Sequence, residues 1–137
     1  MSAIYLDSSV FLRHLFGHRG QLQIKGFPLL AASELLGIEV HRTIDRYRLE
    51  KKITDRETGL LKQEAESFFR GIELVAITRL VKKRASESFP SILGTLDGLH
   101  MATALLLKEK KYSAIQMATH DEQLQNCARA LGFSVLG

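Results

Sequence analysis

Four acidic residues, far apart in the chain, are the side chains best suited to carry out chemistry. They are Asp7, Glu39, Asp97 and Asp121. Carboxylates that crowd into one site repel each other, and some would stay protonated unless a divalent cation removed the conflict. Mg²⁺ and Mn²⁺ prefer carboxylate and water oxygens, and beside a substrate phosphate such an ion activates a water molecule. The four acids therefore indicate a divalent-metal site, for one ion or two, that acts on a phosphate ester.

The elements that must position these acids alternate between strand and helix. Short apolar runs predict strands at 3–6, 29–32, 74–77, 114–118 and 133–136. Amphipathic or apolar periodicity predicts helices from Val10 onward and at 33–49, 54–71, 78–88, 95–111 and 121–131. This alternation predicts a single α/β domain over 1–137, with a central, mostly parallel sheet of four or five strands flanked by helices.

In such sheets, ligands bind beyond the carboxyl ends of the strands. Asp7 directly follows the first predicted strand, and Asp121 comes shortly after the fourth. Asp97 falls in the first turn of the 95–111 helix, whose apolar residues run almost all round it, so we expect that helix to be buried. Glu39 lies at the edge of the apolar face of the 33–49 helix and can point in from there.

Capping signals mark several helix ends. Ser8 or Ser9 is expected to cap the first helix, and Ser33 to start the second. Thr54 and Glu57 form a capping-box pattern, and Gly132 is a helix stop. Residues 18–28 are Gly-rich and polar, which favours a loop.

Each acid also has an ordinary structural interpretation. Asp97 or Asp121 can cap or complement a helix start, and Thr119 with Glu122 can form a capping box around Asp121. Asp7 can be a turn residue, and Glu39 can pair with the residue three positions on, Arg42. Spacing alone leaves both interpretations open.

Composition is that of an ordinary globular protein with a basic balance. The 137 residues are 45% hydrophobic and 25% charged, with a formal net charge of +4 that suits an anionic partner such as nucleic acid. The basic runs at 46–52 and 82–84 either contact an RNA backbone or form solvated helix faces. A single cysteine, the absence of a signal-like leader and the shortness of the apolar runs predict a cytoplasmic protein without membrane contact. No histidine has ligand spacing with that cysteine, which argues against a zinc site.

Four segments resemble the PIN domain superfamily, and within it the VapC-type toxin ribonucleases of toxin–antitoxin pairs. The first is a strand ending in Asp7 with a hydroxyl residue after it, and the second is a serine-led helix with Glu39 and a following Arg42. The third is an Asp-x-x-His-x-Ala motif that starts at Asp97. The fourth is Thr-x-Asp-x-x-Leu from Thr119, followed by Leu-Gly-Phe at 131–133. The four segments occur in this order across nearly the whole chain.

The resemblance implies a PIN-like α/β/α sandwich and a role for each matching residue. Asp7, Glu39, Asp97 and Asp121 would hold Mg²⁺ or Mn²⁺, directly or through water. Ser8 and Thr119 would orient ligands or waters, and Arg42 and Arg46 would hold substrate phosphate. The implied reaction is endonucleolytic cleavage of single-stranded or loop RNA, and the implied partners are a second copy of the chain and a cognate antitoxin.

Some points depart from the family pattern or stay open. The 17–28 stretch is short, so a helix that the family often carries there is expected to be missing or reduced. Glu34 competes with Glu39 as the helical acid, and the leading serine and following arginine favour Glu39. His100 is either a general base or a buried, hydrogen-bonded histidine. The alternative functions are an RNA-processing PIN nuclease without an antitoxin, and a non-catalytic RNA-binding or receiver-like regulatory module.

Overall fold

The computed structural model describes residues 3–17 and 29–137, in which strands and helices alternate. The strands are β1 (Ala3–Leu6), β2 (Leu29–Ser33), β3 (Glu73–Val75), β4 (Gln116–Ala118) and β5 (Val135–Leu136). The helices are α1 (Ser8–Phe16), α2 (Leu35–Leu49), α3 (Asp55–Phe69), α4 (Arg79–Ala85), α5 (Thr95–Lys110) and α6 (Glu122–Ala130). The predicted loop at 18–28 lies outside the described residues, as does nearly all of the 17–28 stretch that departs from the family pattern.

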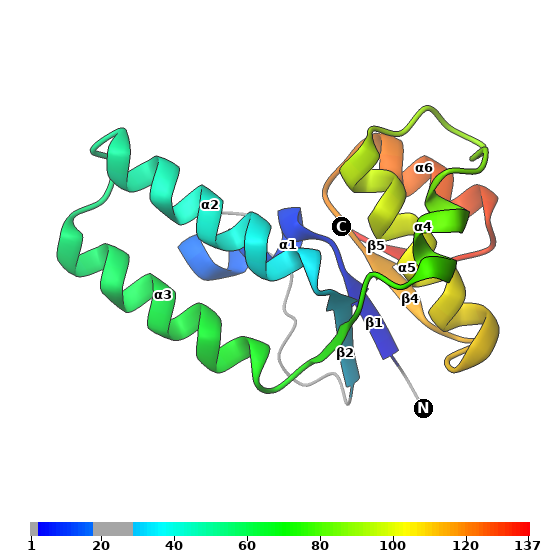
Figure 1. Ribbon diagram of the computed structural model, residues 1–137, viewed down its shortest axis with the longest axis horizontal. Coiled ribbons are helices and arrows are strands. Elements are labelled where there is room, and N and C mark those ends of the chain that lie inside the picture. The colour runs from blue at the N-terminus through cyan, green and yellow to red at the C-terminus, as the bar shows by residue number, and fades with distance from the viewer. Residues whose placement is uncertain (1–2, 18–28) are drawn as a thin grey trace.

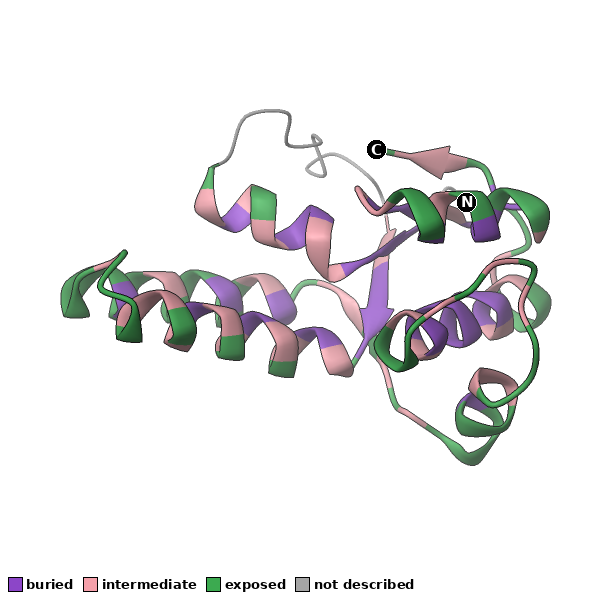
Figure 2. Cartoon of the chain, turned by 90° about the horizontal axis from the view of Figure 1, so that it is seen from above, coloured by how far each residue is buried: buried purple, intermediate pink, exposed green. Residues whose placement is uncertain are grey.

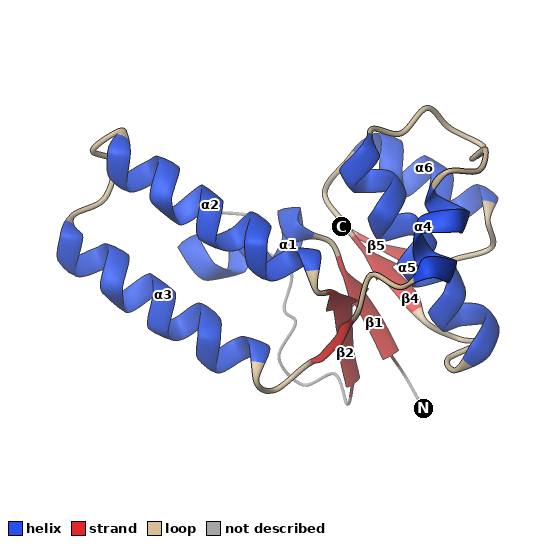
Figure 3. Ribbon diagram, viewed as in Figure 1, coloured by secondary structure: helices blue, strands red, loops and turns tan. Residues whose placement is uncertain are grey.

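The five strands form one sheet in the order β3-β2-β1-β4-β5 (Figures 1 and 3). All four strand pairings are parallel. From β1 the chain first forms β2 and then β3 on one side of that strand. It then crosses to the other side and forms β4 and β5, so the strand order reverses at β1. A crevice beyond the carboxyl ends of the strands at such a reversal is where ligands bind in open α/β sheets. Asp7 and Thr119 directly follow the two central strands at this point.

Helices cover both faces of the sheet, and β1 shows why. Its side chains alternate, because successive residues of a strand point to opposite faces. Ala3 and Tyr5 pack with α5 and α6, whereas Ile4 and Leu6 pack with α1, α2 and α3. Figure 1 shows the α2–α3 pair extending to one side of the sheet and α4, α5 and α6 on the other. The predicted α/β/α sandwich with a mostly parallel sheet of four or five strands is confirmed, and the sheet has five strands, all parallel.

Helix α5 is the most enclosed helix, as its apolar residues on every side predicted. Eight of its residues are buried, including His100 and Met101, and Figure 2 shows that burial from above. Even so, no helix among the described residues is both long enough and apolar enough to span a bilayer.

Three helix starts test the capping predictions. The Thr54–Glu57 capping box is present, with both reciprocal hydrogen bonds. The predicted serine caps of the first helix are wrong: Asp7 is the N-cap residue, and Ser8 and Ser9 are the first residues of α1. Ser33 does not begin α2 but ends β2, and its hydroxyl accepts a hydrogen bond from Leu35 N–H.

Gly132 does stop α6, as predicted, in the left-handed region at φ 89°. The strands β3, β4 and β5 are shorter than the apolar runs that predicted them.

Candidate active site

Asp7 is the most enclosed of the four acids. It follows β1 directly and is only 3% exposed. Its Oδ2 accepts hydrogen bonds from Ser9 Oγ and Thr119 Oγ1, both at 2.8 Å. Its backbone N–H donates to Ala118 O, which ties the end of β1 to the end of β4. Two hydroxyls thus fix Oδ2 of the Asp7 carboxylate, while Oδ1 lies 4.0 Å from His100 Nε2.

Glu39 reaches the same place from α2. Its Oε2 accepts a hydrogen bond from Ser8 Oγ at 3.2 Å, and its Oε1 lies 2.6 Å from His100 Nε2. Glu34, the competing acid, is exposed at the start of α2. No ion pair joins Glu39 to Arg42, so the ordinary surface-pair interpretation of Glu39 is wrong.

Asp97 lies in the first turn of α5, where the charges of the other acids affect the pKa of its carboxyl. Burial raises the pKa of its carboxyl, and the negative charges of Asp7, Asp121 and Glu39 raise it further, against a lowering effect of His100. A carboxyl whose neighbours disfavour its charged form is the arrangement that the crowded-acid argument predicted.

Asp121 serves as a helix cap, and its charge acts on Asp97. It is the N-cap residue of α6, and its Oδ1 accepts a hydrogen bond from Leu124 N–H at 2.9 Å. Its own N–H donates to Thr119 Oγ1. The proposed Thr119–Glu122 capping box is therefore wrong, because Thr119 turns its hydroxyl toward Asp7 instead. Capping uses one Asp121 oxygen, and the charge of this side chain still acts on Asp97.

His100 is a fully buried, hydrogen-bonded histidine beside Glu39 and Asp7. Its Nδ1 lies 2.7 Å from the hydroxyl of Tyr5 on β1, and its Nε2 faces Glu39. Burial alone would lower its pKa, but the hydrogen bond to Glu39 and the charges of Asp7 and Asp97 raise the pKa overall. With both ring nitrogens engaged, His100 presents no lone pair to a metal ion.

Sequence reasoning missed Ser9 and Tyr5. Ser9 donates to Asp7 and accepts from His120 N–H, yet in the chain it reads only as a helix cap. Tyr5 occupies a core position of β1, and its partner His100 lies 95 positions away, so no local pattern signals the contact.

Asp7 and Glu39 thus meet at His100, and the charges of Asp7, Asp121 and Glu39 act on Asp97. Arg42 and Arg46 are on the exposed side of α2, where Arg46 lies 3.9 Å from Glu50. Within 3–17 and 29–137, no three acidic, histidine or cysteine side chains are grouped tightly enough to hold a metal ion.

The donor chemistry nevertheless fits a hard cation. The oxygens without a described hydrogen bond are Asp7 Oδ1, Asp121 Oδ2 and the Asp97 carboxylate. The histidine is engaged and the one cysteine, Cys127, is buried in the core beside α5. A site that offers carboxylate oxygens alone suits Mg²⁺ or Mn²⁺ and not zinc.

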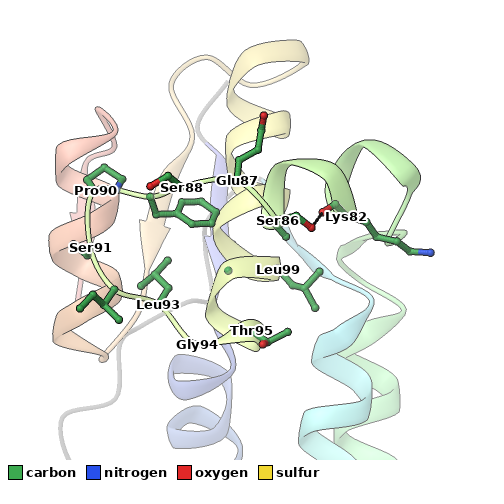
Figure 4. A pocket seen from close by; sticks show the side chains of 14 residues that line it. Lys82, Ser86, Glu87, Ser88, Pro90, Ser91, Leu93, Gly94, Thr95 and Leu99 are labelled. Atoms are coloured by element: carbon green, nitrogen blue, oxygen red, sulfur yellow. Dashed lines mark hydrogen bonds between the residues drawn. The ribbon is translucent and has the colours of Figure 1, made fainter.

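A hollow of about 730 Å³ lies at the start of α5 (Figure 4). The loop at 86–94 and the facing residues of α4 and α5 line it, with Phe89, Leu93 and Leu99 among the apolar members. Its lining includes Gly98, the neighbour of Asp97, but none of the four acids. The hollow therefore flanks the acidic site and is separate from it.

A sequence model described as PIN domain matches residues 4–130, which include all four acids. The chain belongs to the PIN domain family.

Two solved structures share the fold over almost the entire chain. One, titled as a toxin–antitoxin complex from Klebsiella pneumoniae, has a TM-score of 0.68 at 15% identity and covers 98% of this chain and 96% of its own. The other, VapBC2 from Rickettsia felis bound to a DNA fragment from its promoter, has a TM-score of 0.65 at 11% identity, with 98% and 97% covered. At these identities the likeness concerns the fold. No curated protein matches the chain.

Proposed function

We propose that this protein is an Mg²⁺- or Mn²⁺-dependent endoribonuclease and the toxin of a toxin–antitoxin pair. The observation that carries the nuclease proposal is that Asp7 and Glu39, from two elements, both lie at His100, at 4.0 Å and 2.6 Å. Burial and the charges of Asp7, Asp121 and Glu39 raise the pKa of Asp97 beside them. Membership of the PIN domain family supports the same reaction class.

Each residue has a role in this proposal. Asp7, Asp97 and Asp121 would hold the cation, with Glu39 binding it directly or through a water molecule. Ser9 and Thr119 hold Asp7 in one orientation, and Ser8 does the same for Glu39. When bound, the cation would supply an activated water and stabilise charge on the attacked phosphate.

RNA is the proposed substrate because the chain is basic and one helix of the site carries exposed cations. The net charge is +4, and Arg42 and Arg46 follow Glu39 along α2. Cations beside an acidic metal site draw a polyanion toward carboxylates that would otherwise repel it. We propose that these two arginines hold phosphates next to the one that is cleaved.

The toxin proposal is supported by the relatives that share the fold. One similar structure is described as a toxin–antitoxin complex and the other as VapBC2, and each aligns over nearly its full length with this chain. The proposal accordingly includes an antitoxin partner, a homodimer and a cytoplasmic location.

Metal-dependent cleavage of RNA by the purified protein tests the nuclease. We expect single-stranded RNA to be cut with Mg²⁺ or Mn²⁺ and not with EDTA. Asp97→Asn should abolish cleavage, whereas Glu34→Gln, which alters an exposed acid at the start of α2, should leave it intact. Cleavage that persists in EDTA or in Asp97→Asn would refute the assignment.

Induced expression in bacterial cells tests the toxin. Growth arrest that Asp7→Asn relieves supports it. Harmless expression of a protein that cleaves RNA in vitro would instead indicate an RNA-processing enzyme. Binding of RNA without cleavage would indicate a non-catalytic module.

A further inference from the structure

A buried chain of hydrogen bonds leads from the sheet to Glu39. Ser33 N–H donates to the Tyr5 hydroxyl at 3.2 Å, that hydroxyl lies 2.7 Å from His100 Nδ1, and His100 Nε2 lies 2.6 Å from Glu39 Oε1. Tyr5 and His100 are both 0% exposed. The chain therefore connects β2, β1, α5 and α2 without contact with solvent until it reaches Glu39.

The hydrogen-bonding roles along this chain can be assigned from its ends. A backbone N–H only donates, so the Tyr5 oxygen accepts from Ser33, and the same hydroxyl bonds His100 Nδ1. A carboxylate only accepts, so the proton between His100 and Glu39 belongs to Nε2. In the neutral ring and in the imidazolium alike, Nε2–H donates to Glu39 while Nδ1 bonds the Tyr5 hydroxyl. Tyr5 thus holds the ring in the orientation that donates to Glu39.

Glu39 depends on the His100 donor for its orientation more than Asp7 depends on any single donor. It comes from a helix and carries a long side chain, whereas Asp7 has a short side chain held by two hydroxyls. Ser8 holds one Glu39 oxygen at 3.2 Å, and His100 holds the other at the shorter distance of 2.6 Å. Partners behind a metal ligand fix its orientation, and their loss typically lowers metal affinity about 10- to 100-fold.

We propose that Tyr5 is a positioning residue of this site, which acts through His100 to hold the Glu39 carboxylate in place for a divalent cation. This role rests on the proposed metal-dependent function. Tyr5 touches neither substrate nor cation. Its hydroxyl matters because it orients a histidine that the site needs as a donor.

Mn²⁺ titration of the purified protein by calorimetry tests the role without any activity assay. Tyr5→Phe removes only the hydroxyl and should weaken Mn²⁺ binding about 10-fold. Tyr112→Phe is the matched control, because its hydroxyl bonds Glu73 away from the acids, and it should bind as the parent does. Glu39→Gln should make Tyr5→Phe silent in the double variant, since the two changes act through one carboxylate.

Two histidine variants supply a second comparison should Tyr5→Phe fold poorly. His100→Gln keeps an N–H close to the position of Nε2 and should retain more affinity than His100→Leu, which has no donor. Equal loss in the two would overturn the role, as would unchanged affinity in Tyr5→Phe.

The nitrogen signals of His100 separate this inference from the proposed function. In metal-free protein, ¹⁵N spectra should show protonated Nε2 donating to a carboxylate, with Nδ1 changed in Tyr5→Phe and unchanged in Tyr112→Phe. If these signals agree but the parent binds no Mn²⁺, the metal-dependent function fails while the hydrogen-bond chain stands. If Mn²⁺ binds but the signals do not respond to Tyr5→Phe, only the role of Tyr5 fails.

Discussion

Removing one hydroxyl, that of Thr119, should destabilise the metal-free protein sharply. Thr119 is fully buried, and its hydroxyl donates to Asp7 Oδ2 at 2.8 Å while accepting from Asp121 N–H at 3.0 Å. Thr119→Val keeps the shape of the side chain, so the change tests these two hydrogen bonds without opening a cavity.

The expected loss of stability follows from the hydrogen bonds that Asp7 and the Asp121 N–H no longer make. A hydrogen bond to a charged group contributes about 1.5–3 kcal/mol, and an unpaired buried N–H costs about 1–3 kcal/mol. Ser9 still donates to Asp7, and the start of α6 is only partly buried, so each contribution falls in the lower part of its range. The free energy of unfolding should therefore drop by about 3 kcal/mol, and the melting temperature by about 10 °C.

Urea unfolding followed by circular dichroism, at pH 7 with EDTA, measures this loss. Thr58→Val is the matched control: Thr58 is also buried, but its hydroxyl donates to Thr54 O, which also accepts from Thr58 N–H. The control should lose less than about 1 kcal/mol. A loss for Thr119→Val within error of the control would refute the view that Thr119 holds Asp7 in place.

Three further changes probe other parts of the structure. Asp97→Asn should stabilise the metal-free protein at pH 7. Because the pKa of Asp97 is raised in the folded state, the stabilisation of the fold by its protonated carboxyl is full below about pH 3.9. That stabilisation is lost as the pH rises through the folded-state pKa, and the Asn variant does not lose it. Denaturant titrations should therefore show a gain that is near zero at pH 4 and grows to pH 7, and a gain independent of pH would contradict this cause. Gly132→Ala should cost about 1 kcal/mol by the same titration, because φ is 89° and the nearest atom, Lys108 Cε at 3.9 Å, leaves room for the methyl group. Thr54→Ala removes the hydroxyl that caps α3 and should also cost about 1 kcal/mol, and no change in its unfolding midpoint would argue against the cap.

The fold was predictable because apolar periodicity reports burial, and burial decides the layers. The strand at 3–6 and the all-round apolar helix starting at Thr95 match their predicted positions closely. The edge strands are shorter than expected because a strand extends only as far as its neighbour supplies hydrogen bonds. β5, for instance, pairs with β4 through two residues.

The site was predictable only in part. Acids that follow adjacent parallel strands meet at the same edge of the sheet. Asp7 and Asp121 could therefore be placed from their positions in the chain. The contact that Ser8 makes could not be predicted, since its intrinsic preference is that of a helix cap and only the family resemblance gave it a role in the site, whereas in the fold its hydroxyl turns to Glu39, 31 positions away. Such contacts depend on how α1 and α2 pack, which no local pattern encodes.

The position of β1 has a consequence for the order in which the protein becomes complete. β1 is the middle strand of the sheet, and one of its two neighbours, β4, is synthesised long after it. The hydrogen bond between Thr119 and Asp7 spans 112 positions. A growing chain that still lacks β4 therefore has no finished acidic pocket, and the proposed nuclease gains its site only once β4 and Asp121 have been made.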